Sequence, residues 1–115
     1  MERRLFVRFP MSGTAVLQPE QKSPRALDCE VFDVSYGGMG VFCPEQLDRG
    51  GLVKFVLLNR QLNVNISGMG RITHCSPAKF NDKDCFRVGI EFINVDNGQV
   101  RLLLQQIRDV FGGEG

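Results

Sequence analysis

The sequence has no apolar segment long enough to cross a membrane. Its longest uninterrupted apolar run is Phe55-Val56-Leu57-Leu58, whereas a membrane-spanning helix needs roughly 20 apolar residues. The arginines near the N-terminus are not followed by an apolar segment of about 7–15 residues, so no secretory signal is predicted. We therefore expect a cytoplasmic protein without membrane insertion.

The sequence also lacks the spacing of a metal site. It has one histidine, His74, and its four cysteines include no Cys-x-x-Cys pair. A zinc site assembled from close ligand pairs is therefore not indicated. In a reducing compartment we expect four reduced thiols, mostly in the core: Cys29, Cys43, Cys75 and Cys85.

Catalytic motifs are missing as well. Asp33, Ser35 and His74 are the residue types of a hydrolytic triad. Their spacing does not support one, and the chain has no Gly-x-Ser-x-Gly elbow. The glycines at 37–40 are not followed by the Lys-Ser/Thr of a phosphate-binding loop. We predict a protein that is not an enzyme and needs no cofactor.

Neither sign of charge dominates. The 115 residues include 14 basic and 13 acidic ones, a net charge of +1, so we expect no DNA binding, which normally requires a dominant basic face. However, Arg3, Arg4 and Arg8 crowd the first eight residues, where only Glu2 offsets them. Such a cluster can bind a small polyanion, although taken alone it is more often a solvated run of charge.

Most of the chain has the pattern of short strands. Apolar and polar residues alternate in several segments. Val31-Phe32 breaks the alternation, which indicates a bulge or a change of exposed face. Ser67-Gly68 is expected to form a turn, and residues 77–84 are polar and expected to be exposed. Many short strands with regular turns are typical of a barrel or sandwich. The expected strands are 14–17, 27–32, 40–43, 52–58, 62–66, 70–75 and 86–92.

The period changes after Asp96. Apolar residues at helical spacing form one stripe, Asp96 or Asn97 can cap the start, and Gly112-Gly113 stops the helix. The stripe could cover the sheet or serve a dimer, so a monomer or weak dimer is expected. Its residues are Val100, Leu103, Leu104, Ile107, Val110 and Phe111.

A second polar element lies about 25 residues after the arginines. In Asp33-Val34-Ser35-Tyr36-Gly37-Gly38 the carboxylate of Asp33 can accept hydrogen bonds from the N1–H and N2–H₂ edge of guanine, and Ser35 can donate or accept. Gly38 lets a ligand approach the backbone closely. A local turn made by the Asp and Ser side chains is the plainer interpretation, and both can hold together.

These two elements resemble the paired signature of PilZ domains, Arg-x-x-x-Arg followed by Asp/Asn-x-Ser-x-x-Gly. Arg4 and Arg8 match the first half, and Asp33, Ser35 and Gly38 match the second. Gly70-Arg71-Ile72 and Val88-Gly89-Ile90-Glu91-Phe92 are similar to weaker strand patterns later in that family. The resemblance covers nearly the whole chain, and no signature position departs from the pattern.

The resemblance implies a mainly β fold, a six-stranded antiparallel barrel with a C-terminal helix. It divides the single domain 1–115 into a flexible arm at 1–12, a barrel at 13–95 and a helix at 96–111. It implies a receptor for cyclic di-GMP whose site is formed by Arg3, Arg4, Arg8, Asp33, Ser35, Gly37 and Gly38. In similar proteins an arginine at the position of Arg3 accompanies a stacked pair of ligand molecules.

Three functions are open at this point. In the first, cyclic di-GMP changes the conformation of the arm, and a protein partner recognises the new surface. In the second, the chain is an adaptor that acts through protein contacts without a nucleotide. In the third, the chain binds single-stranded nucleic acid weakly. Against this function, it has no tryptophan and a single tyrosine, Tyr36, to stack on bases.

Overall fold

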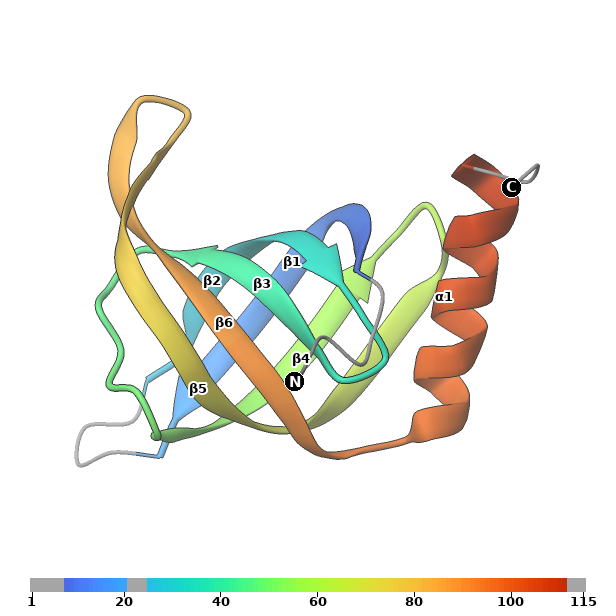
Figure 1. The fold of residues 1–115 in the computed structure, drawn as a ribbon, viewed down its shortest axis with the longest axis horizontal. Coiled ribbons are helices and arrows are strands. Elements are labelled where there is room, and N and C mark those ends of the chain that lie inside the picture. The colour runs from blue at the N-terminus through green and yellow to red at the C-terminus, as the bar shows by residue number, and fades with distance from the viewer. Residues whose placement is uncertain (1–7, 21–24, 112–115) are drawn as a thin grey trace, which may run out of the picture.

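The computed structural model describes residues 8–20 and 25–111. This part of the chain forms six antiparallel strands in a closed barrel of order β1-β2-β3-β6-β5-β4, followed by one helix (Figure 1). The predicted six-stranded barrel with a C-terminal helix is therefore confirmed. The elements are β1 Phe9–Pro19, β2 Leu27–Val34, β3 Gly38–Cys43, β4 Leu52–Asn59, β5 Val64–Phe80, β6 Lys83–Val95 and α1 Asn97–Phe111.

The barrel is filled by the inward face of each strand. Successive side chains of a strand point to opposite faces, so the apolar positions of the alternating pattern meet inside the closed sheet. Each large apolar side chain that is fully buried contributes about 1.5–3 kcal/mol relative to exposure. The largest fully buried ones in the barrel are Phe55, Leu17, Met39, Leu57 and Ile72.

Strand β1 begins earlier than the sequence pattern predicts. Phe9 pairs with Val34 and Pro10 pairs with Asp33, so residues 9–12 belong to the barrel and not to the arm. The predicted strand at 14–17 covers only the middle of β1, whose pairing with β2 begins at Phe9. This pairing brings Arg8, the residue before β1, beside Asp33, near the end of β2.

Strand β5 corrects the prediction of two strands joined by a turn at Ser67-Gly68. One strand continues through both residues, because the glycines there permit close packing instead of a turn. A Cβ at Gly68 would lie 2.5 Å from the Asn94 carbonyl oxygen, and one at Gly70 would lie 2.5 Å from a methyl group of Ile90. Glycine inside a strand often marks such a close approach.

The residues at 77–84, expected to be polar and exposed, are exposed or half-buried in the structure. Strands β5 and β6 continue as a hairpin that extends beyond the barrel (Figure 1). Asn81 and Asp82 form its tip with φ of 54° and 64°, a conformation that Asn and Asp tolerate better than most residues. This part of β5 pairs with β6 alone. Pro77 therefore lies in an edge segment of the sheet, where proline is tolerated.

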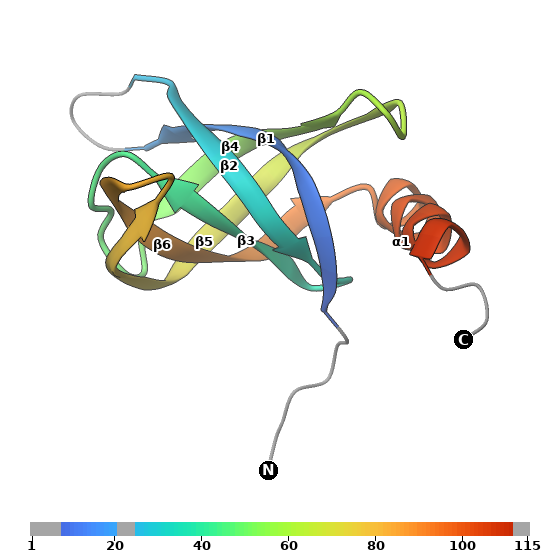
Figure 2. The ribbon, with the colours of Figure 1, turned by 90° about the horizontal axis from the view of Figure 1, so that it is seen from above.

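Helix α1 lies at one end of the barrel, beside the connection between β4 and β5 (Figures 1 and 2). Asp96 caps it as predicted, since its Oδ1 accepts hydrogen bonds from the Gly98 and Gln99 amides at 2.9 and 3.2 Å. Val100, Leu103 and Ile107 are buried against the core. No helix among the described residues has the length and apolar character needed to span a membrane.

Candidate functional site

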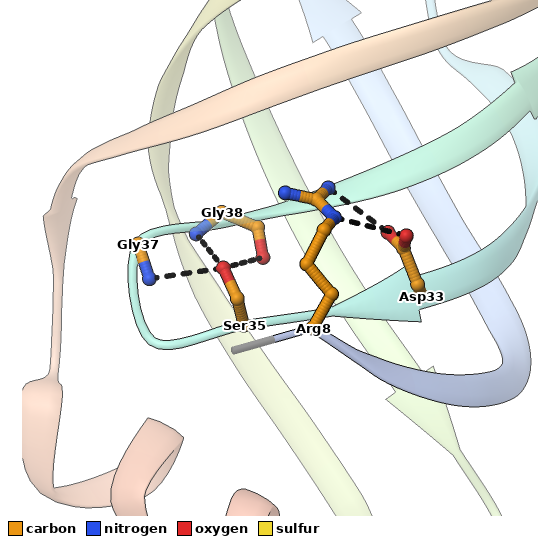
Figure 3. Close-up of polar contacts among 5 residues, drawn as sticks. All are labelled: Arg8, Asp33, Ser35, Gly37 and Gly38. Carbon is orange, nitrogen blue, oxygen red and sulfur yellow. Dashed lines mark hydrogen bonds and ion pairs between the residues drawn. The ribbon is translucent and has the colours of Figure 1, made fainter. Parts of the chain in front are cut away.

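The side chains of Arg8 and Asp33 join the two sequence elements on the barrel surface. Arg8 donates from Nε to Asp33 Oδ2 at 2.9 Å and from an Nη to Asp33 Oδ1 at 3.0 Å (Figure 3). This is the two-bond geometry that a guanidinium and a carboxylate form best. Arg8 is 41% exposed and Asp33 is 19% exposed, so the pair lies at the surface with its carboxylate partly shielded.

Ser35 orders the turn between β2 and β3. Its Oγ accepts hydrogen bonds from the amides of Gly37 and Gly38 at 3.2 and 3.1 Å and donates to the Gly38 carbonyl at 3.3 Å (Figure 3). The Ser35 amide also donates to that carbonyl, at 2.8 Å. The side chain is buried, with 2% of the residue exposed. In this structure the hydroxyl is therefore turned into the protein and serves the turn.

A close contact, and not a positive φ, requires the glycine at position 38 of this turn. A Cβ at Gly38 would lie 2.2 Å from the Ile90 carbonyl oxygen of β6. The space that Gly38 leaves is thus filled by the barrel wall. Gly37 is half-buried, and its carbonyl accepts a hydrogen bond from the Phe92 amide at 2.8 Å. These contacts tie the turn to strand β6.

A surface groove of about 530 Å³ begins at the Arg8–Asp33 pair. Besides these two residues its wall includes Phe32 and Gly40 of β2 and β3, His74 of β5 and Arg87 of β6. We call it the Arg8 groove. It combines two guanidinium groups with one carboxylate, so an anionic ligand with polar edges fits its charge.

Sequence reasoning did not select Gly40 or Arg87. A Cβ at Gly40 would lie 2.4 Å from the Phe32 ring and 2.7 Å from Asp33 Oδ1, so this glycine allows both side chains to lie over β3. The break in alternation at Val31-Phe32 was the available signal, because Phe32 is the extra residue of a bulge in β2. Nothing in the sequence pattern connected that bulge with Arg87, 55 positions later.

A hydrolytic triad is not formed by Asp33, Ser35 and His74. His74 is exposed, and its Nε2 lies 3.0 Å from Ser76 Oγ, while the Ser35 hydroxyl is held within its turn. Within residues 8–20 and 25–111 no group of three metal-ligating side chains is present.

All four cysteines are free thiols, of which Cys29 and Cys43 are buried and Cys75 and Cys85 half-buried. The prediction that most of the four thiols lie in the core is therefore confirmed for two of them. A hydrogen bond with the Cys43 thiol, together with burial, raises the pKa of Cys29, so this thiol is neutral at physiological pH.

Arg3 and Arg4 lie outside the described residues. Of the seven residues that the resemblance assigns to the site, the structure describes Arg8, Asp33, Ser35, Gly37 and Gly38. It brings these five together at one end of the β2–β3 hairpin (Figure 3).

Comparison with known proteins relates nearly the whole chain to one family. The family model of the PilZ domain matches residues 2–109, whereas no curated protein matches the sequence. The PilZ domain of YcgR from Escherichia coli, solved with c-di-GMP, is 19% identical with a TM-score of 0.72, and the match covers 94% of this chain and 91% of that one.

Two longer proteins have a similar domain. The inhibitor of motility MotI/DgrA from Bacillus subtilis is 15% identical with a TM-score of 0.76, covering 99% of this chain and 54% of that one. The K. pneumonia MrkH–c-di-GMP complex is 15% identical with a TM-score of 0.73, covering 96% of this chain and 52% of that one. This chain therefore spans about half the length of both proteins, and the likeness establishes the shared fold.

Proposed function

The chain belongs to the PilZ domain family, and from this premise we propose that it is a receptor for cyclic di-GMP without catalytic activity. The observation that carries the proposal is the contact between Arg8 and Asp33, one residue from each half of the family signature, at the mouth of the Arg8 groove. The YcgR and MrkH structures, both solved with c-di-GMP, support the choice of ligand.

The Arg8 guanidinium is oriented before the ligand arrives. It has five N–H donors, and two of them are used by Asp33. The remaining three can face outward, and a pair of them can bind a phosphate or the O6 and N7 of guanine with two parallel bonds. Because Asp33 already holds the side chain, less conformational entropy is lost when the ligand binds.

Asp33 has a second role in the proposal. Each carboxylate oxygen has more than one acceptor site, so Asp33 can keep Arg8 in place and still accept from the N1–H and N2–H₂ groups of a guanine. Ser35, Gly37 and Gly38 act indirectly, because their hydrogen bonds and close packing hold the end of β2 in position.

The arm supplies the remaining contacts. We assign Arg3 and Arg4 to the second guanine and the phosphates, with two stacked ligand molecules per chain. Ligand binding then draws the arm onto the barrel and alters a surface that a protein partner recognises. Such a shift requires the ligand to bind the two arm states with different affinities. Equal nuclear relaxation of the arm amides with and without cyclic di-GMP would contradict the switch.

Titration calorimetry tests the receptor proposal directly. Cyclic di-GMP should bind the purified chain with saturable heat and a stoichiometry of two, while GTP serves as the control for a single guanine nucleotide. Absence of heat at micromolar protein would overturn the proposal. Binding of a protein partner that is unaffected by Arg8→Ala together with Arg4→Ala would favour the adaptor, and salt-dependent binding of any oligonucleotide would favour the nucleic-acid binder.

A further inference from the structure

Phe32 stands between an aromatic ring and a guanidinium on the outside of the barrel. The centroids of the Phe32 and Phe42 rings are 4.8 Å apart, and Arg87 Cζ lies 4.6 Å from the Phe32 centroid. Phe42 in turn stacks on Phe80 of the β5–β6 hairpin at 4.9 Å. Arg87 therefore ends a row of three aromatic rings, which we call the Phe row.

The backbone explains why Arg87 and Phe32 meet. Phe42 pairs with Arg87 across β3 and β6, which sets Arg87 beside the strand of the middle ring of the row. The bulge in β2 inserts Phe32 between the residues paired with Val41 and Gly40. Because Gly40 has no side chain, the Phe32 ring can lie over it. The position of Arg87 thus depends on neighbouring strands that are far apart in sequence.

Arg87 lies in the wall of the Arg8 groove, together with Arg8, Asp33 and Phe32. The two arginines differ in their partners. Asp33 neutralises Arg8, whereas Arg87 has no ion pair within the described part of the chain. Arg87 is also exposed, so its guanidinium rests on Phe32 and remains accessible from the groove.

We propose that Arg87, supported by Phe32, is a stacking position for a purine base of the ligand, outside both halves of the family signature. A guanidinium is planar and weakly hydrated, and it stacks on aromatic faces and on bases. Phe32 restricts the side chain through the cation–π contact, so little freedom is lost when a base covers the other side. The positive charge of Arg87 also attracts the phosphates that accompany the base.

This inference rests on the proposed function, because it names a further contact for the same ligand. A purely electrostatic role makes a different prediction: lysine would replace arginine without loss, because Lys carries the same charge as a compact ammonium group. A stacking role requires the planar group, so lysine would not restore binding.

Titration calorimetry with cyclic di-GMP distinguishes these roles in the full chain. Arg87→Ala should weaken binding about 10-fold, the effect expected for loss of one stacked base. Arg87→Lys should weaken it nearly as much, and Phe32→Leu should also weaken it, because the support of the guanidinium is lost. Arg101→Ala, which removes the same charge from an exposed position on α1, is the matched control and should bind as the parent chain does.

Each alternative outcome has one meaning. Parent-like binding by Arg87→Ala, with the parent chain binding normally, would overturn this inference and leave the receptor proposal intact. Parent-like binding by Arg87→Lys would overturn the stacking role. Absence of binding by the parent chain would overturn both proposals. Thermal unfolding of each variant checks that the barrel is retained, and because Arg87 is exposed we expect its variants to unfold as the parent chain does.

Discussion

Replacement of Arg8 by alanine should separate binding from stability. The Arg8–Asp33 pair is well formed, but Arg8 is 41% exposed. Exposed ion pairs contribute about 0.2–1 kcal/mol to folding, and the Asp33 carboxylate left behind can still be hydrated. We therefore expect the free energy of unfolding to fall by no more than about 1 kcal/mol in Arg8→Ala.

The expected effect on binding is larger. Arg8 would donate two charge-assisted hydrogen bonds to the ligand, and hydrogen bonds to charged groups contribute about 1.5–3 kcal/mol. That range corresponds to a Kd for cyclic di-GMP raised roughly 10- to 150-fold. Titration calorimetry measures the Kd, and urea unfolding measures stability on the same preparations. An unchanged Kd in Arg8→Ala would refute the role given to this residue.

A double-mutant cycle with Asp33→Ala tests how the pair acts. Because Asp33 both orients Arg8 and accepts from a guanine in this proposal, the loss in binding free energy of the double variant should be smaller than the sum of the two single losses, as expected for residues in contact. The double variant should bind less tightly than Arg8→Ala alone, because the guanine contact of Asp33 is also lost. Fully additive losses would contradict the orienting role, and a double variant that binds as Arg8→Ala does would contradict the guanine contact.

Three further predictions concern the structure around the site. Gly38→Ala should destabilise the barrel by about 1–3 kcal/mol, because its Cβ would lie 2.2 Å from the Ile90 carbonyl oxygen; an unchanged urea midpoint would contradict the packing at this position. Ser35→Ala should cost about 1–3 kcal/mol in the same assay, since the Gly37 and Gly38 amides lose their acceptor, and a variant as stable as the parent would disprove the role of the hydroxyl. Cys29 should resist iodoacetamide at pH 8 in the folded chain, because it is buried and its pKa is raised, and should react after denaturation in urea; equal rates in both states would show that the thiol is accessible.

The sequence predicted the local elements well where one period dominates. Alternation at 86–92 and the helical stripe after Asp96 both correspond to elements of the structure. The break at Val31-Phe32 predicted the bulge in β2 correctly. These signals depend on the direction in which successive side chains point, which is a local property of the backbone.

The same reasoning failed at glycines, which can either form a turn or allow close packing within a strand. Ser67-Gly68 was expected to turn the chain, yet the structure continues as one strand because Gly68 and Gly70 face atoms of β6. Only the closed barrel decides between a turn and close packing, since the contacting atoms of β6 lie 20 or more residues away in sequence. Likewise the alternation could not locate the start of β1, where pairing with β2 includes Pro10 and Asp33.

The same distinction between local sequence signals and tertiary contacts applies to the candidate site. The sequence alone determined which residue types stand in the two signature elements, and through the family resemblance it indicated the fold and the class of ligand. Only the tertiary structure decided that Arg8 contacts Asp33, that Ser35 is buried within its turn, and that Arg87 rests on Phe32 beside the same groove. The physical reason is closure of the barrel: pairing of β1 with β2 and of β3 with β6 brings together side chains that no local period relates.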